Sequence, residues 1–235
     1  AIDHIKNIPA TMGVQPHAPY SCSKTVYEAA FASGLPVATH LAETREELSC
    51  TLNNEGPLVD LAKRLGKWDA SVKPWSSHPI DSILSVAGDA RFLAAHINYI
   101  EDRHLELLAC SNITVVYCPR ASAYFGHEDH QWKSMVEAGV NVALGTDSLL
   151  CLDTKDRISV IDEMRFLYET ENADPQQLFT MAMVNGAIGL GLDPELVTMS
   201  PGATAGFVSF DVTGKNPLIS ILESSTLPSW VVQPS

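Results

Sequence analysis

Short apolar runs alternate along the chain with longer segments in which apolar residues recur at helical spacing. The apolar runs predict five strands, over 11–16, 37–41, 91–96, 113–117 and 140–144. The intervening patterns predict helices at about 24–33, 43–66 with a break near 53–57, 82–87, 101–110 and 131–138, an irregular excursion over 67–82 and a loop over 121–130. Strands that alternate with helices are typical of an α/β fold with a parallel sheet.

The pattern changes after residue 145. Two further helices are expected at about 156–170 and 175–189, and then a turn at Ser200-Pro201-Gly202. A strand is expected over 206–212, with more turn and strand signals over 213–235. We therefore expect an α/β domain over residues 1–200 and part of a small β appendage over 201–235.

The amino-acid composition limits the kinds of partner and cellular setting that we expect for the chain. The formal net charge of −13, from 15 basic and 28 acidic residues, argues against a nucleic acid or an anionic membrane, which both require basic surface. The five cysteines are scattered without a C-x-x-C pair, which favours a reduced, cytoplasmic setting. No uncharged run reaches eighteen residues, and no signal peptide is visible.

Four residues that could take part in catalysis or metal binding lie at the ends of predicted strands: His17, His40, His96 and Asp147. In a (β/α) barrel the carboxyl ends of all strands open onto one face, so these side chains would converge. Imidazole and carboxylate groups are ligands for a divalent metal that activates water. Glu43, three residues after His40, could exchange a proton with such a water. Taken singly, each is also explained as a buried histidine, a turn aspartate or a helix-opening glutamate.

Weaker candidates lie elsewhere. The loop His127-Glu128-Asp129-His130 could cover the pocket, contact a polar substrate or simply open a helix. Arg120 could bind a carboxylate or pair with an acidic neighbour, and Tyr124 and Phe125 could stack on a flat ring or pack at the rim. Two tryptophans of the excursion, Trp68 and Trp75, are interpreted as packing residues.

Six motifs in order carry a family resemblance: QPHAPYS, THLAET, AHINYIED, VVYCPRAS, AGVNVALGTDS and NGAIGLGL. The chain resembles the amidohydrolase superfamily, and within it the branch of S-adenosylhomocysteine/methylthioadenosine deaminases, guanine and cytosine deaminases and triazine hydrolases. The resemblance covers about residues 11–212. It implies the fourth through eighth strands of a (β/α)8 TIM-type barrel, followed by the final β return.

The resemblance implies a role for each motif residue. His40 and Asp147 match metal ligands, and Asp147 is also the general base. Glu43 matches the glutamate that carries a proton to the ring nitrogen, and His96 matches the histidine that polarises water or substrate. His17, Glu43 and His96 are the implied substrate contacts. The implied cofactor is one divalent ion, zinc first, with iron and manganese also compatible with these ligands.

The implied activity is metal-dependent hydrolytic deamination of a purine-like or pyrimidine-like ring, a hydrolase reaction on a small molecule. Chlorohydrolase or amide hydrolase chemistry by the same mechanism is one alternative. The family's first-strand H-x-H pair is absent from this sequence, and two protein ligands are fewer than the usual three or more. A non-catalytic half-barrel is therefore a second alternative. We expect either a segment of a longer protein or strands supplied from elsewhere, and a homo-oligomer would cover exposed sheet edges.

Overall fold

In the computed structural model, the described residues are 12–154, 156–199, 201 and 205–232. They form two compact units, and the chain passes between them more than once. The first unit is Ala1–Val116 with His127–Asn141, and the second is Tyr117–Gly126 with Val142–Ser235. Among the described residues, no helix is long and apolar enough to cross a membrane.

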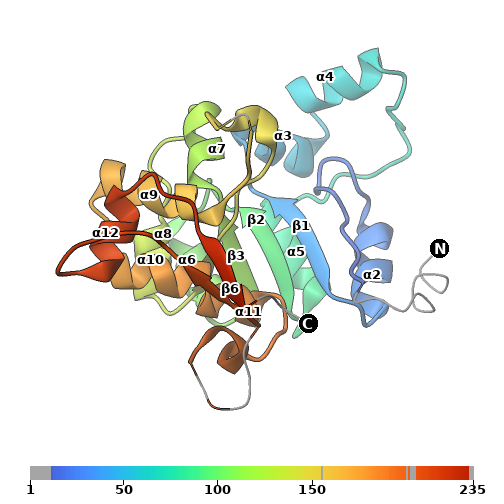
Figure 1. The fold of residues 1–235 in the computed structure, drawn as a ribbon. Coiled ribbons are helices and arrows are strands. Elements are labelled where there is room, and N and C mark those ends of the chain that lie inside the picture. Colours follow the sequence, from blue (N-terminus) through green and yellow to red (C-terminus); the bar gives the residue numbers. More distant parts are fainter. Residues whose placement is uncertain (1–11, 155, 200, 202–204, 233–235) are drawn as a thin grey trace. The chain divides into compact units, whose positions relative to one another are not determined.

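A parallel sheet organises the first unit. Its strands β1 (Val37–Leu41), β2 (Phe92–His96) and β3 (Ile113–Tyr117) pair in that order (Figure 1). Leu41 is paired with His96 at the carboxyl end of the first two strands. The predicted α/β fold with a parallel sheet is confirmed, and the strand ends that carry the motif histidines are neighbours.

Helices of the first unit connect these strands. Their bounds are α2 Lys24–Ala32, α3 Arg45–Asn53, α4 Pro57–Arg64, α5 Pro79–Ala87, α6 Asp102–Ala109 and α8 Trp132–Glu137. Each corresponds to a predicted helix, and the break between α3 and α4 falls where it was expected. Asn54 ends α3 in the left-handed conformation that asparagine tolerates. The helix predicted at 82–87 begins earlier, because Pro79 occupies its first turn and His78 caps it.

The core of the first unit lies between sheet and helices. Its largest fully buried side chains include Tyr27, Phe92, Ile80 and Ile83. Burying each such side chain contributes roughly 1.5–3 kcal/mol. The Tyr27 hydroxyl lies 2.6 Å from Oγ1 of Thr39 on β1, so its polar end is also satisfied.

The expected strand over 11–16 is wrong. In its described part, Val14 forms an isolated parallel bridge to Val37, with hydrogen bonds from Val14 N to Pro36 O and from Ala38 N to Val14 O. Pro16 has no N–H to donate, so the ladder is interrupted there, and the next hydrogen bond to β1 runs from His40 N to His17 O. Residue 11 lies outside the described residues.

The second unit contains the remaining elements, except that Asn141, the first residue of its parallel strand, belongs to the first unit. These are α7 Pro119–Tyr124, β4 Asn141–Leu144, α9 Val160–Glu171, α10 Pro175–Ala182, α11 Val184–Gly189, β5 Phe207–Ser209, α12 Pro217–Glu223 and β6 Ser229–Val232, with 3-10 turns at Leu149–Cys151 and Pro194–Val197. β5 and β6 form an antiparallel pair. After β4, the Gly145 N–H donates to the carbonyl of Tyr117, the last residue of β3.

The predicted loop over 121–130 is partly wrong, because α7 runs through its first residues. Pro119 starts the helix, and the backbone N–H of Arg120 donates to Glu163 on α9. The Arg120 side chain donates to Glu163 and Asp153 at 2.7 and 2.6 Å. Arg120 therefore pairs with acidic neighbours, and the partner that stabilises this helix start comes from a segment about forty residues away.

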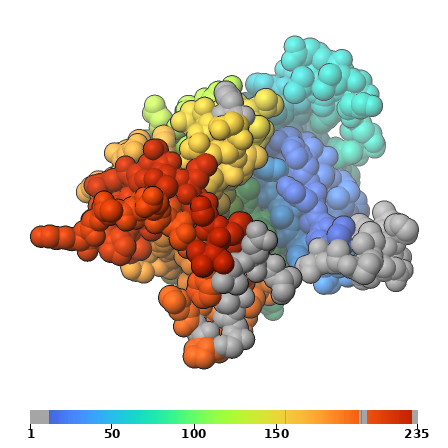
Figure 2. All heavy atoms as spheres, in the orientation of Figure 1, coloured from blue at the N-terminus to red at the C-terminus, as the bar shows by residue number. Residues whose placement is uncertain are grey.

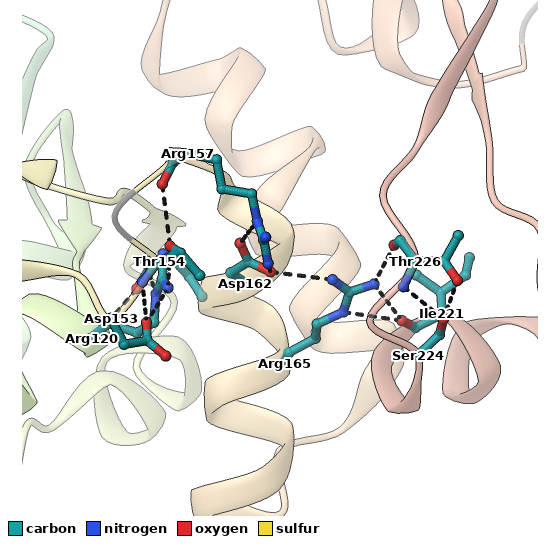
Figure 3. A network of polar contacts seen from close by, with 10 residues as sticks. Arg120, Asp153, Thr154, Arg157, Asp162, Arg165, Ile221, Ser224 and Thr226 are labelled. Carbon is teal, nitrogen blue, oxygen red and sulfur yellow. Dashed lines mark hydrogen bonds and ion pairs between the residues drawn. The ribbon is translucent and has the colours of Figure 1, made fainter.

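An ion-pair network holds the tail to α9 (Figure 3). Asp162 accepts from Arg157 and Arg165, and Arg165 also donates to the carbonyl groups of Ile221 and Thr226. The segment after 213 was expected to hold turns and strands, and α12 is a correction. Asn216 caps that helix by accepting from two backbone N–H groups, and Pro217 occupies its first position.

Two further boundaries differ from expectation. α9 begins at Val160 instead of near 156, and the helix expected over 175–189 is divided into α10 and α11 at Met183, whose ψ of −74° departs from a regular helix. All five cysteines are free in this structure.

Candidate active site

Two histidines from neighbouring strands meet at the carboxyl end of the sheet. Nδ1 of His40 lies 2.9 Å from Nε2 of His96, and the rings stack with centroids 5.1 Å apart. His96 is buried, and burial, together with the nearby His40, lowers its pKa to about 3. His96 is therefore neutral near pH 7, with a nitrogen lone pair available to a proton or a metal ion.

The backbone at the end of β2 explains how these rings meet. His96 is paired with Leu41, and paired residues of regular strands point to the same face of the sheet. His40 precedes Leu41, so in regular strands its side chain would point to the opposite face from that of His96. His96 has φ 75° and Ile97 has φ 54°, so the extended alternation ends there. Left-handed backbone in residues other than glycine costs roughly 1–3 kcal/mol and is concentrated at functional sites.

Glu43 reaches the same place from the turn after β1. Its Oε1 lies 3.7 Å from Nε2 of His96, and its side chain is 20% exposed. The turn is tied to the end of β2 by hydrogen bonds from the Asn98 side chain to the Glu43 carbonyl and from the Tyr99 N–H to the Ala42 carbonyl. The backbone of Glu43 is therefore fixed, and its carboxylate lies beside His96.

A buried glutamate that the sequence reasoning missed holds this turn. Glu47 is fully buried, and its two carboxylate oxygens accept from the N–H groups of Ala42 at 3.1 Å and Glu43 at 2.9 Å. Burial raises its pKa to about 8, against the lowering effect of these hydrogen bonds. The available signal was the spacing Thr44-x-x-Glu47, a capping-box pattern at a helix start. Here the Thr44 side chain accepts from the Glu47 N–H. The Glu47 side chain accepts from Ala42 and Glu43 instead of from Thr44.

His17 lies beside His40. The His40 N–H donates to the His17 carbonyl at 2.8 Å, and the two rings have centroids 5.2 Å apart. The Nδ1 of His17 is 2.8 Å from the Ser21 hydroxyl, which fixes the ring. The Gln15 amide nitrogen lies 3.5 Å from Nε2 of His40, a neighbour that the sequence reasoning did not include.

The His127–His130 loop supports the site from outside. His130 is half-buried, and its Nε2 donates to the backbone carbonyl of His96 at 2.8 Å. Burial lowers its pKa to about 4. His127 Nδ1 lies 2.9 Å from the hydroxyl of Tyr99, and Arg45 stacks over the Tyr99 ring. These contacts favour the structural interpretation of the loop.

Asp147 belongs to the second unit, three residues after β4. Its φ of 54° repeats the left-handed backbone seen at His96. The Cys151 thiol lies 3.7 Å from its Oδ2. The first unit thus brings together His17, His40, Glu43 and His96, and Asp147 sits in a similar backbone context at the end of another strand.

Comparison with known proteins gives one family. The model of the amidohydrolase family matches residues 2–234. A 5-methylthioadenosine/S-adenosylhomocysteine deaminase from Thermococcus sibiricus is 27% identical over 216 residues, covering 88% of this chain and 46% of that protein. The chain therefore spans a little under half the length of this curated relative.

Solved structures give the same fold. A zinc-bound adenosine deaminase from Xanthomonas campestris aligns with a TM-score of 0.73 and 19% identity, over 95% of this chain and 50% of that one. An atrazine chlorohydrolase from Arthrobacter aurescens TC1, complexed with zinc, aligns with a TM-score of 0.69 and 15% identity, over 96% and 51%. At these identities the likeness concerns the fold.

Proposed function

The chain belongs to the amidohydrolase family, and we propose that the complete protein hydrolytically deaminates an amino-substituted heteroaromatic ring. The observation that carries this proposal is the cluster of His40, His96 and Glu43 at the carboxyl end of a parallel sheet. The methylthioadenosine/S-adenosylhomocysteine deaminase of Thermococcus sibiricus supports a purine-like substrate. In the balanced reaction, a water oxygen bonds to the ring carbon, the C–N bond breaks and ammonia leaves.

The donor chemistry of the site fits a divalent metal. His40 and His96 bring two imidazole nitrogens to within 2.9 Å, and neutral imidazole is a zinc donor. We propose that His40 and Asp147 hold the ion, and that the family's H-x-H residues lie in a part of the protein outside this sequence. When bound, the ion lowers the pKa of a water molecule toward about 7. The zinc of the two solved structures favours zinc over iron or manganese.

The residues of this chain then divide the proton transfers. Asp147 receives a proton from the attacking water, and His96 orients that water or the substrate. Glu43, which lies beside His96 and is fixed by its backbone, delivers a proton to the ring nitrogen so that the amino group can leave. His17, held by Ser21, contacts the substrate beside His40.

We propose a (β/α)8 barrel for the complete protein, with this chain supplying its fourth through eighth strands. The support is the parallel sheet, together with the hydrogen bond from Gly145 to the last residue of β3. Residues 1–200 would belong to the barrel and 201–235 to a β appendage, which the β5–β6 pair supports. We also propose that the complete protein is a homo-oligomer in the cytoplasm, with reduced cysteines.

A second candidate is dechlorination or amide hydrolysis by the same residues. The structural likeness to an atrazine chlorohydrolase favours keeping this candidate. A non-catalytic role is the third, because no H-x-H pair occurs in the sequence. Ammonia, chloride and carboxylate release distinguish the first two, and no turnover with any substrate would indicate the third.

The test uses Glu43→Gln and, as a matched control, Glu46→Gln on the exposed face of α3. Ammonia release from S-adenosylhomocysteine, methylthioadenosine and adenosine is measured for the complete protein. We expect Glu43→Gln to lower turnover by about 10²–10⁴-fold with unchanged metal content, and Glu46→Gln to keep activity. Wild-type turnover in Glu43→Gln would contradict the assigned role.

A further inference from the structure

The first unit contains a cavity of about 870 Å³ that the paired histidines do not line. It is bounded by the loop before α2, by α4, and by the segment 67–77. In the space-filling view, α4 and this segment form the cyan overhang, with a hollow beneath it (Figure 2). None of His17, His40 and His96 is among the residues that line it. Its size is that of a pocket for a small organic molecule, roughly 300–1,000 Å³.

Specific hydrogen bonds hold the walls of this cavity. The Trp75 indole N–H donates to the Pro19 carbonyl at 3.1 Å, which joins the segment 67–77 to the loop before α2. The Asn54 side chain donates to the Val72 carbonyl at 2.7 Å, which joins the same segment to the end of α3. The walls are therefore tied together at both ends, and a ligand would meet a largely pre-formed site.

The lining combines apolar surface with aromatic rings. Leu61 of α4 is 42% exposed, Leu65 directly after this helix is 63% exposed, and Val72 is 42% exposed. Trp68 and Trp75 add two indole rings. Apolar side chains that stay exposed around a concavity favour a ligand with an apolar or aromatic body.

The charge of the lining is opposite to that of the chain. Among the described residues, Lys24, Lys67 and Lys73 line the cavity, and Asp69 is the one acidic residue of this lining. The whole chain has 15 basic and 28 acidic residues. The Asp69 carboxylate also accepts from the N–H and hydroxyl of Ser71, so part of its charge is directed into its own turn. The cavity is thus a positive region on an acidic protein, which attracts anions.

We propose that this cavity binds an organic anion with an apolar or aromatic body, its carboxylate, sulfonate or phosphate group facing the lysines. The cavity borders the proposed deamination site, because Ser21 lines it and holds His17, but the proposal does not rest on the proposed function. The charge contrast selects the anion, and the exposed leucines and tryptophans select its apolar body.

The probe is 1-anilinonaphthalene-8-sulfonate, an aromatic anion, compared with the uncharged N-phenyl-1-naphthylamine. Fluorescence titrations use the wild-type protein, Lys67→Gln/Lys73→Gln, and the control Lys215→Gln, an exposed lysine of the second unit. We expect saturable sulfonate binding near one site per chain, weakened about tenfold in the double variant. Lys215→Gln should bind as wild type does, and the uncharged probe should not distinguish the variants. Far-UV circular dichroism verifies the fold of each variant.

Alkylation of Cys22 tests whether the probe binds in the cavity. It lines the cavity, whereas Cys110 is exposed at the end of α6, so the two thiols form an internal control. The sulfonate should slow iodoacetamide alkylation of Cys22, read by peptide mass spectrometry, and leave Cys110 unchanged. Unsaturable binding, equal binding to the double variant, tighter binding of the uncharged probe, or unchanged Cys22 alkylation would each overturn the proposal. Loss of deamination in Glu43→Gln, by contrast, has no bearing on these readings.

Discussion

The turn that carries Glu43 depends on one buried carboxylate, and Glu47→Ala tests this dependence. The substitution removes the acceptor of two N–H groups, those of Ala42 and Glu43, while Ala42 itself is only 2% exposed. A buried donor left without a partner costs about 1–3 kcal/mol. The Ala42 N–H is buried and the Glu43 N–H only half-buried, so we expect the loss to be about 1–3 kcal/mol, most of it from Ala42. That is a large part of a typical stability of about 5–15 kcal/mol.

Equilibrium urea unfolding measures this loss, with Glu46→Ala as the matched control. Glu46 is exposed on the same helix, and its substitution should change stability by less than about 0.5 kcal/mol. A loss below about 1 kcal/mol in Glu47→Ala would refute the reasoning, since it would mean that water or another group satisfies both N–H groups.

Glu47 also makes the stability of the folded protein depend on pH, in a direction that follows from its pKa. The pKa of Glu47 is raised from 4.5 to about 8 in the folded protein, so the folded state binds the proton more tightly than the unfolded state. Its contribution to stability is present below pH 4.5 and is lost as the pH rises to about 8. Glu47→Gln, which does not titrate, should flatten this decline in urea midpoints measured from pH 5 to 8. An unchanged slope would show that Glu47 is ionised in both states.

Three other predictions concern different parts of the molecule. Arg165→Met removes the donor to Asp162 and to the carbonyls of Ile221 and Thr226, and should cost about 2–4 kcal/mol in thermal or urea unfolding; an unchanged midpoint would contradict the network in Figure 3. The pKa of His130 is lowered to about 4, so its contribution to stability is lost as the pH falls from 6.5 toward 4, and His130→Gln should lose less stability over that range than wild type. Metal analysis with intact mass should find about one zinc per chain in the complete protein, and dialysis against a chelator should abolish turnover that zinc then restores; full activity without metal would exclude the proposed mechanism.

Much of the fold could be predicted from local pattern. The β-branched run Ile113–Tyr117 became β3, and Asn53–Pro57 divided α3 from α4, because hydrophobic period and turn residues act over a few residues. The motif residues His40, Glu43 and His96 could also be singled out, since each follows an apolar run at a strand end.

Tertiary contacts decided the remainder. α7 replaced an expected loop because Glu163 accepts from the backbone and side chain of Arg120. α12 lies in a tail whose sequence indicated strands, and Arg165 donates to carbonyls around it. His96 turns toward His40 through a left-handed backbone, and Glu47 holds the Glu43 turn from within the core. The sequence by itself determined which residues are candidates for chemistry, because residue type and period are local. Their geometry was decided by hydrogen bonds and packing between distant segments, whose free energy appears only once the chain has folded.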